Sequence, residues 1–289
     1  MRNQLLELLE KRMQQCVADG RGPVLDDKFE RKTRLFERRN SAIVNVKARG
    51  NIQVINSQED TEEVDYQVHL QYFIKQKDHF YVEEEIENRR GIFYKGILIE
   101  DKEILISPQD DLMRDLSVVD AQSDEVRYTY DRRKAVQYAE KWWNSYNPAY
   151  HQFEVDCTNY ISQCVRAGGA PMRGYPNRGT GWWMQNNSWS YSWAVANAFP
   201  RYLEASKQGL RAKVVSDVSQ LKLGDVICYD FEGDGKYNHT TIVTAKDGNG
   251  EPLVNAHTYN SRMRYWAYED STAYTPNIKY RFFSIIDGQ

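Results

Sequence analysis

The strongest constraint on the fold is a period of two in the first part of the chain. From residue 42 to about residue 106, apolar and polar residues alternate, most regularly over residues 64–74. Because successive side chains of a strand point to opposite faces, this alternation predicts an antiparallel sheet with one buried face and one face in water. Turns are predicted at residues 75–78 and 88–91, where the alternation is interrupted.

Short amphipathic helices are predicted ahead of this sheet. They span residues 3–18 and about 26–37, and the second combines Phe29, Leu35 and Phe36 with many charged residues. Apolar residues at helical spacing among charges are typical of helices that pack one face on a core. Helices followed by an antiparallel sheet indicate an α+β arrangement.

The chain is long enough for two domains of ordinary size, since it has 289 residues of which 41% are hydrophobic. We predict an N-terminal accessory domain over residues 1–120, made of these helices and the antiparallel sheet. A stretch rich in Asp and Ser, residues 107–125, is expected to be the linker. A second domain is predicted over residues 126–289, and it carries the residues that indicate chemistry.

The second domain contains a predicted helix that is bounded at both ends. Cys157, Ile161 and Cys164 form an apolar stripe at i, i+4 and i+7. Asp156 precedes the stripe where a helix cap is expected, and residues 168–171 (G-G-A-P) form a stop signal. These signals place Cys157 in the first turn of the helix.

A thiol in the first turn lies in the positive field of free backbone N–H groups, which lowers its pKa and favours thiolate. The negative charge of Asp156 opposes this effect, so Cys157 needs a partner base to become a nucleophile. Burial as a small hydrophobic residue is the usual role of a free cysteine, and we expect it for Cys16, Cys164 and Cys228. Cysteines without a dense spacing pattern do not indicate a disulfide framework.

The partner base is expected at the beginning of a strand. His239 follows a glycine-containing turn and starts a β-branched run. A hairpin is predicted here, with strands over residues 239–245 and 253–258 and a turn rich in Asp, Asn and Gly between them. A histidine at the start of a strand is more accessible than one in the middle of a sheet, so we predict His239 as the base.

The register of this hairpin decides which residue orients the ring of His239. In the preferred register His239 lies opposite His257. This register pairs Ala245 with Glu251, and one residue of slip would turn both Asn255 and His257 to the other face. A Cys-His site needs a third group that accepts the other ring N–H of the base. We predict His257 for this role, with Asn255 as the alternative.

These segments resemble a known family. Residues 156–164 (D-C-T-N-Y-I-S-Q-C), the glycine stop, residues 223–227 (L-G-D-V-I) and the histidine strand occur together in this order. They are similar to the putative amidase domain of Gram-positive bacteria, a family related to the papain-like cysteine hydrolases that include the NlpC/P60 and CHAP domains. The resemblance covers about residues 130–286.

The resemblance implies a papain-like (NlpC/P60-like) α+β fold, in which the helix that begins with the nucleophile packs on an antiparallel sheet. It implies that Cys157 is the nucleophile, that His239 is the base and that a third polar residue lies on the next strand. The implied substrate is a peptide or a peptidoglycan fragment with an amide bond. We expect no cofactor.

These expectations combine into amide hydrolysis by acyl transfer. The Cys157 thiolate would attack an amide carbonyl, and backbone N–H groups at the helix start, its own included, would stabilise the oxyanion. His239 would protonate the leaving amine and activate the water that releases the acyl group.

Substrate contacts are expected from an aromatic loop and from the helix start. Trp182 and Trp183 are predicted to line a groove for a peptide or a saccharide, because residues 171–188 form a long loop-like segment with three glycines. Core packing is the other interpretation of these tryptophans. Asp156 and Asn159 flank the thiol and are also expected to contact the substrate.

Other classes of function could use the same residues. A non-catalytic module could keep the papain-like scaffold and bind a peptide or cell-wall fragment through the aromatic groove. A zinc hydrolase could use Cys157, His239 and His257, but the sequence has no close ligand pair such as C-x-x-C. Residues 230–235 match the first half of a calcium loop, but Thr241 stands where the bidentate Glu belongs. We interpret them as a turn and expect no metal.

Composition limits the partners. A formal net charge of −3 carries no signature of a nucleic-acid-binding protein, so no nucleic acid is expected. No run of residues is apolar enough for a transmembrane helix, and the first residues lack the segments of an export signal. The sequence as written predicts a cytoplasmic protein, with export by another route left open. It does not specify an oligomeric state.

Overall fold

The computed structural model describes residues 1–17, 27–105 and 127–288, and the contacts divide the chain into two compact units. Unit 1 consists of Met1–Ile106 and Tyr259–Thr272, and unit 2 consists of Ser107–Thr258 and Ala273–Gln289. The predicted linker at residues 107–125 lies outside the described residues. Each unit combines helices with antiparallel strands, so the chain is α+β.

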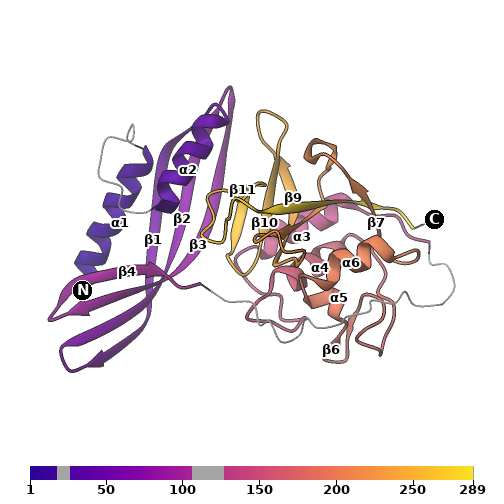
Figure 1. Cartoon of the computed structure of the whole chain (residues 1–289), viewed down its shortest axis with the longest axis horizontal. Coiled ribbons are helices and arrows are strands. Elements are labelled where there is room, and N and C mark those ends of the chain that lie inside the picture. The colour runs from indigo at the N-terminus through magenta and orange to yellow at the C-terminus, as the bar shows by residue number, and fades with distance from the viewer. Residues whose placement is uncertain (18–26, 106–126, 289) are drawn as a thin grey trace. The chain divides into compact units, whose positions relative to one another are not determined.

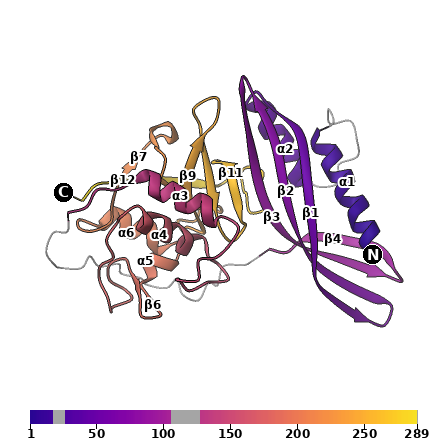
Figure 2. The same cartoon turned by 180° about the vertical axis from the view of Figure 1, so that it is seen from behind.

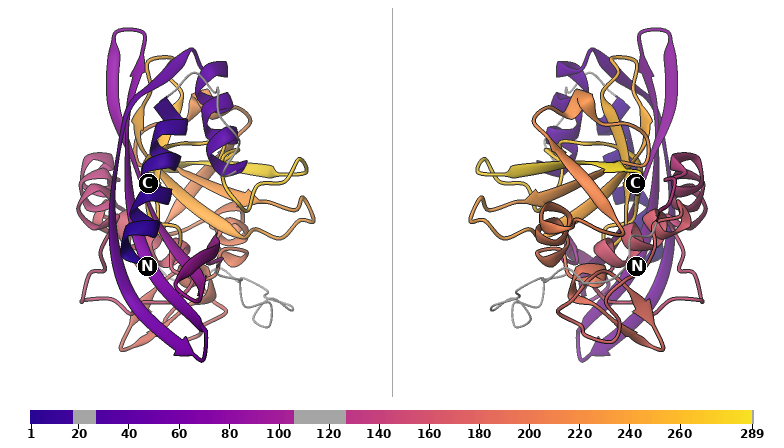
Figure 3. Two further views of the ribbon diagram at one scale, coloured as in Figure 1. Left: turned by 90° about the vertical axis from the view of Figure 1, so that its left-hand side faces the viewer. Right: turned by 90° about the vertical axis from the view of Figure 1, so that its right-hand side faces the viewer.

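Unit 1 is a sheet of antiparallel strands covered by helices (Figure 1 and Figure 2). Its elements are α1 (Arg2–Val17), α2 (Asp27–Arg38), β1 (Ser41–Gln58), β2 (Thr61–Gln76), β3 (His79–Tyr94), β4 (Ile97–Glu103) and β11 (Ser261–Tyr265). β2 pairs with β1 and with β3, while β4 and β11 both pair with β3 at different positions along it. The long strands bend along their length (Figure 3).

The predicted alternation is clearest on β2. Every second side chain is buried, namely Val64, Tyr66, Val68, Leu70, Tyr72 and Ile74. Leu5 and Leu9 of α1 and Phe29 and Phe36 of α2 pack into the same core. The prediction of an antiparallel sheet with alternate residues buried is therefore confirmed, and both helices lie within one residue of their predicted bounds.

The turn predicted at residues 88–91 is wrong, because β3 continues through it to Tyr94. Gly91 is a strand residue that pairs with Val64. A Cβ atom at Gly91 would lie 3.2 Å from a methyl carbon of Leu5. This glycine lets α1 approach the strand closely. In the sequence alone, a glycine with this role cannot be distinguished from a glycine in a turn.

Unit 2 contains an antiparallel sheet in the order β10-β9-β8-β12-β7. The strands are β7 (Arg211–Val215), β8 (Val226–Asp230), β9 (His239–Lys246), β10 (Pro252–Ala256) and β12 (Lys279–Ile286), and a small hairpin is formed by β5 (Met184–Gln185) and β6 (Ser188–Trp189). The helices are α3 (Arg132–Trp142), α4 (Cys157–Ala167), α5 (Tyr191–Ala194), α6 (Ala198–Ala205) and the 3₁₀ turn η2 (Val218–Gln220). α3 and α4 contact β9, and α6 contacts β7.

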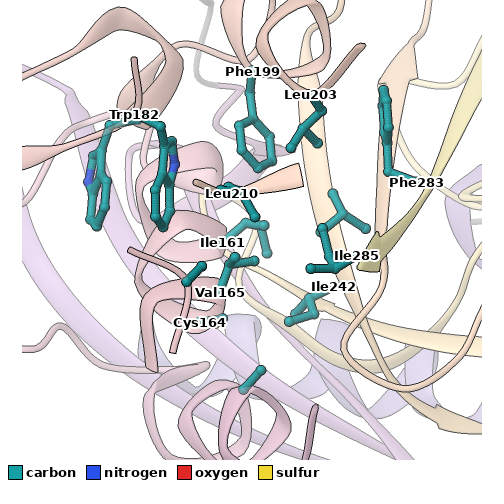
Figure 4. Close-up of a cluster of buried hydrophobic side chains, with 14 of the residues drawn as sticks. Ile161, Cys164, Val165, Trp182, Phe199, Leu203, Leu210, Ile242, Phe283 and Ile285 are labelled. Carbon is teal, nitrogen blue, oxygen red and sulfur yellow. The ribbon is translucent and has the colours of Figure 1, made fainter. Parts of the chain in front are cut away.

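The core of unit 2 lies between α4, α6 and the sheet (Figure 4). Its members include Ile161, Cys164, Val165, Trp182, Phe199, Leu203, Leu210, Ile242, Phe283 and Ile285. Ile161 and Cys164 of the predicted apolar stripe belong to this core, although all residues of α4 from Cys157 to Val165 are buried. Cys16, Cys164 and Cys228 are buried and form no disulfide bond, as expected for packing residues.

α4 ends at Ala167, where the glycine stop predicts it. Gly169 adopts a φ of 101°, in the left-handed region that glycine tolerates and most residues avoid. A Cβ atom at Gly168 would lie 2.3 Å from the ring of Tyr130, so the chain passes too close there for any side chain.

Candidate active site

Cys157 is the first residue of α4, as the sequence predicts, and it is 1% exposed. Its Sγ lies 3.8 Å from the hydroxyl oxygen of Thr158. That oxygen lies 3.2 Å from the hydroxyl oxygen of Thr240 on β9. The thiol is therefore enclosed where the start of α4 meets β9.

Burial raises the pKa of the Cys157 thiol, because the thiolate would lose its hydration. Hydrogen bonds from the Thr158 side chain and the Thr240 backbone act in the lowering direction, and the charge of Asp156 again raises the pKa. The sequence predicts that the helix start lowers this pKa and that Asp156 opposes it, and in the structure burial outweighs the lowering influences. In this conformation the thiol is the neutral form at neutral pH.

Asp156 does not cap α4 with its side chain. Its Oδ1 accepts hydrogen bonds from the backbone N–H of Phe153 at 3.0 Å and from Nδ2 of Asn159 at 2.8 Å. Its Oδ2 lies 2.8 Å from Nδ1 of His257. The predicted cap is wrong because the carboxylate contacts the Phe153 N–H, the Asn159 side chain and His257, and accepts from none of the backbone N–H groups of the first turn.

His257 lies behind this carboxylate. Its Nδ1 contacts Asp156, and its Nε2 lies 2.7 Å from the carbonyl oxygen of Trp142. A carbonyl oxygen only accepts, so Nε2 donates to Trp142, and a further proton lies between Nδ1 and the Asp156 carboxyl group in their hydrogen bond. The ring stacks on Tyr160 with a centroid separation of 3.9 Å. Both ring nitrogens of His257 are thus engaged on the helix side of the sheet.

The hairpin forms, but its register differs from the preferred one. β9 and β10 pair Ala245 with Leu253. Past a bulge they pair Ile242 with Asn255. The predicted pairing of Ala245 with Glu251 is wrong, since the bulge and the wider turn shift the strand.

Asn255 is engaged on the helix side as well. Its Oδ1 accepts a hydrogen bond from the Thr244 hydroxyl at 2.9 Å, and its Nδ2 donates to Glu140 of α3 at 2.8 Å. It pairs with Ile242, whose side chain belongs to the core beneath α4. Asn255 and His257 therefore share a face, as their spacing predicts.

His239 is the first residue of β9 and pairs with Tyr229 of β8. Pairing is regular from His239 to Ile242. Because these residues are three positions apart, the side chains of His239 and Ile242 belong to opposite faces of the sheet. The ring of His239 stacks with Phe231 at 6.1 Å and lies 5.7 Å from the ring of Tyr229. Thr240, the next residue, contacts α4 through its hydroxyl group. The structure thus brings Thr240 close to the start of α4 and bonds His257 to Asp156, while the strand pairing assigns the His239 side chain to the other face of β9.

Trp182 and Trp183 are core residues, with exposures of 0% and 1%. The indole N–H of Trp182 donates to the Ser162 hydroxyl at 2.9 Å, and that of Trp183 donates to the carbonyl oxygen of Thr180 at 3.0 Å. They pack inside unit 2 and do not form the wall of an open groove. This is the core interpretation that the sequence also allowed.

Asn159 is buried too. Its Oδ1 accepts from the indole N–H of Trp193 at 2.8 Å, and its Nδ2 donates to Asp156 and, at 2.9 Å, to the carbonyl oxygen of His151. Asp156 and Asn159 were expected to contact substrate. In the structure they fix the loop ahead of the nucleophile to α4.

Sequence reasoning missed an aromatic group on this loop. His151, Phe153 and Trp189, here called the aromatic patch, have ring centroids 4.7 to 4.8 Å apart. His151 is exposed, and the guanidinium of Arg178 lies 5.3 Å from the ring of Trp189. The backbones of His151 and Phe153 bond to Asn159 and Asp156. Their closeness to Cys157 in sequence was the available signal, but Trp189 joins them only through the fold.

Residues 230–235, which match the first half of a calcium loop, form a turn that is held by the carboxylate of Asp230. Asp230 accepts hydrogen bonds from the backbone N–H groups of Gly233, Asp234 and Gly235 at 2.7 to 3.2 Å. Within the described residues, no group of three or more His, Cys, Asp and Glu side chains is arranged to hold a metal ion. No helix in the described ranges has the length and apolar character needed to cross a bilayer.

Comparison with known proteins adds the family. The family described as putative amidase domain matches residues 129–283. The chain is 54% identical over 268 residues to the uncharacterized protein YhbB of Bacillus subtilis (strain 168), a match that spans 90% of this chain and 86% of that protein. It is 34% identical over 140 residues to the uncharacterized protein YjcM of the same strain, which covers 45% of this chain and 31% of that protein. No solved structure matches the chain.

Proposed function

The chain belongs to the putative amidase domain family, and on that premise we propose that it is a cysteine-dependent hydrolase of amide bonds in peptides or peptidoglycan fragments. The observation that supports this proposal best is the position of Cys157. It begins α4, which packs on an antiparallel sheet, and the residue before it is fixed by a buried histidine. A papain-like relationship of unit 2 is part of the proposal, because that arrangement of helix and sheet is the one the resemblance implies.

Cys157 is the proposed nucleophile and His239 the proposed base. His239 takes the thiol proton, the sulfur forms a bond to the amide carbonyl carbon, and the carbonyl oxygen becomes an oxyanion. Collapse of this intermediate breaks the C–N bond while His239 protonates the leaving amine. Water then hydrolyses the thioester, returning the thiol and releasing a carboxylic acid. Because Cys157 is buried in the present conformation, the proposal requires that substrate binding opens the start of α4 and moves the beginning of β9, so that His239 reaches the thiol.

The third role departs from the sequence-based prediction. Both ring nitrogens of His257 are taken by Asp156 and the carbonyl group of Trp142, so His257 is not placed to orient the ring of His239. The amide of Asn255 is bonded to Thr244 and Glu140. We assign His257 instead to the support of the nucleophile, through the carboxylate of the preceding residue.

The aromatic patch is the proposed substrate-contacting surface in place of the buried tryptophans. Stacked rings beside a guanidinium group suit the apolar face of a sugar ring or a peptide side chain. Its backbone is bonded to Asp156 and Asn159, so a ligand there would lie on the loop that precedes Cys157.

A second candidate function is a binding module without catalysis. The buried thiol with a raised pKa favours it, because a resting neutral thiol is a poor nucleophile. Such a module would use the aromatic patch and would not need Cys157.

Hydrolysis by matched variants separates the two candidates. Cys157→Ala and Cys164→Ala each remove a buried thiol from α4, and only the first removes the proposed nucleophile. Release of new amino groups from peptidoglycan digests should persist in Cys164→Ala and be lost in Cys157→Ala, and His239→Asn should lower it by about 100-fold or more. Equal hydrolysis by both cysteine variants would reject the enzyme, and fragment binding without hydrolysis by the unaltered protein would establish the binding module.

A further inference from the structure

Thr258 stands in a backbone conformation that its side chain disfavours. Its φ is 76°, in the left-handed region, and threonine is β-branched. Such residues are rare there, and they persist where the surroundings hold them in place. Thr258 is the second residue after β10 and the last residue of its segment of unit 2. The contacts of the Thr258 side chain can hold its backbone in this conformation.

The hydroxyl oxygen of Thr258 accepts two backbone hydrogen bonds at the nucleophile. The N–H of Asp156 donates to it at 3.0 Å, and the N–H of Cys157 donates to it at 3.1 Å. With His257 bonded to the carboxylate of Asp156, two consecutive side chains hold two consecutive residues. We call His257 and Thr258 the nucleophile clamp.

The Thr258 hydroxyl group takes the place of a side-chain cap at the start of α4. Asp156 does not cap α4 with its own side chain, so the first N–H groups need another acceptor. Thr258 supplies it from the turn that follows β10. The acceptor is a neutral oxygen beside the sulfur-bearing residue, at a donor distance like that required by the oxygen of a tetrahedral intermediate.

We propose that Thr258 is a positioning residue whose hydroxyl group holds the Cys157 N–H in the resting protein and yields it to the carbonyl oxygen of the bound substrate. The inference rests on the proposed function, since it needs Cys157 to form a covalent intermediate. One N–H cannot serve both oxygens fully, so the hydroxyl and the substrate compete. The disfavoured backbone conformation of Thr258 makes its departure easier, because leaving relieves the strain.

The competition predicts opposite effects on stability and on reactivity. Thr258→Val keeps the branched shape but removes the oxygen, so the buried N–H groups lose their acceptor and the folded state is less stable. The same change frees the N–H for the substrate oxygen. Thr258→Ser keeps an acceptor and is the conservative variant that should behave like the unaltered protein.

The test uses a short peptide aldehyde, N-acetylalaninal. The thiol adds across its C=O bond: a C–S bond forms, the carbonyl π bond breaks and the thiol proton passes to the oxygen, giving a hemithioacetal. Its oxygen stands where an oxyanion would stand. We expect Thr258→Val to bind the aldehyde about fivefold more tightly than the unaltered protein, because one neutral hydrogen bond contributes about this factor to an equilibrium. Thr258→Ser should match the unaltered protein, and Cys157→Ala should not bind.

Urea unfolding and hydrogen exchange of the Asp156 and Cys157 amides complete the test. The inference holds if Thr258→Val unfolds at lower urea and exchanges these amides faster while binding the aldehyde more tightly. A residue with only a structural role would lose stability and aldehyde affinity together, and that result, or unchanged affinity, overturns the inference alone. No covalent adduct in the unaltered protein would overturn the proposed function as well.

Discussion

Cys157 combines a position that favours thiolate with surroundings that oppose it. Its place in the first turn of α4 exposes the sulfur to the field of the N–H groups. Burial removes water from the sulfur, and this is the largest influence on its pKa. The backbone N–H of Cys157 also donates its hydrogen bond to the hydroxyl oxygen of Thr258. The resting site is therefore arranged against spontaneous reaction.

The pH dependence of alkylation reports this balance. We expect the rate at which iodoacetamide labels Cys157 to rise with pH through an inflection above that of a free thiol, because the thiolate reacts and a raised pKa leaves less of it at neutral pH. Mass spectrometry of the labelled peptide measures the rate at each pH. In the urea-unfolded chain the inflection should return to about 8.5. An inflection in the folded protein at or below that value would contradict the buried resting thiol.

His257→Gln should destabilise unit 2 by about 2–4 kcal/mol, because it removes the ring that is hydrogen-bonded to the buried Asp156 carboxyl group. Urea unfolding at neutral pH measures the loss. His79→Gln changes an exposed histidine and should stay within about 0.5 kcal/mol of the unaltered protein. Combining His257→Gln with Asp156→Asn should cost less than the sum of the single changes. Strict additivity would show that the two side chains do not act as a pair.

Among the elements, α4 was predictable and the hairpin register was not. The bounds of α4 follow from local signals: the apolar stripe, and glycines that stop the helix. The register depends on a bulge after Leu253 and on the carboxylate of Asp247, which accepts from the N–H groups of Asn249 and Glu251. Alternation cannot encode a bulge, and one residue of shift changes the face of every later side chain.

The contact between α2 and β3 was also not predicted from the sequence, although the helical spacing of the lysines and the strand spacing of the glutamates are both visible in the sequence. Lys28 and Lys32 are one helical turn apart, and Glu83, Glu85 and Glu87 occupy alternate positions of one strand. Lys32 pairs with Glu83, and Lys28 pairs with Glu87 and lies 3.3 Å from Glu85. Charged residues normally indicate a wet face. Here the helical and strand spacings match, and the charges meet inside the unit.

Lys32→Met should destabilise unit 1 by about 3–5 kcal/mol, because it removes the cation that pairs with the buried Glu83 and leaves the buried Asp270 with Arg264 alone. Lys11→Met offers the matched control: Lys11 forms an exposed i,i+4 pair with Glu7, and its loss should cost less than about 0.5 kcal/mol. Urea unfolding followed by circular dichroism measures both. A loss for Lys32→Met as small as that of Lys11→Met would show that the buried pairs contribute nothing beyond packing.

At the scale of the whole molecule, each unit is built from separated stretches of the chain. The sequence-based division assigned residues 259–272 to the second domain, whereas their contacts place Tyr259–Thr272 in unit 1. β11 pairs with β3 at Glu84 and Glu85, and Asp270 lies 2.7 Å from Nζ of Lys32. Local patterns identify strands and helices, but a short strand that joins a distant sheet carries no local sign of its partner.

A fragment of residues 1–106 should therefore be less stable than unit 1 in the full chain. It lacks β11, and in it Lys32 loses its ion pair with Asp270 and Glu84 loses its ion pair with Arg262. The comparison is a chain in which residues 259–272 follow residue 106 through a flexible glycine-serine linker. We expect cooperative urea unfolding of the joined chain and a broad or absent transition for the short fragment. Equal midpoints would show that unit 1 is complete without the segment that returns from the second half of the sequence.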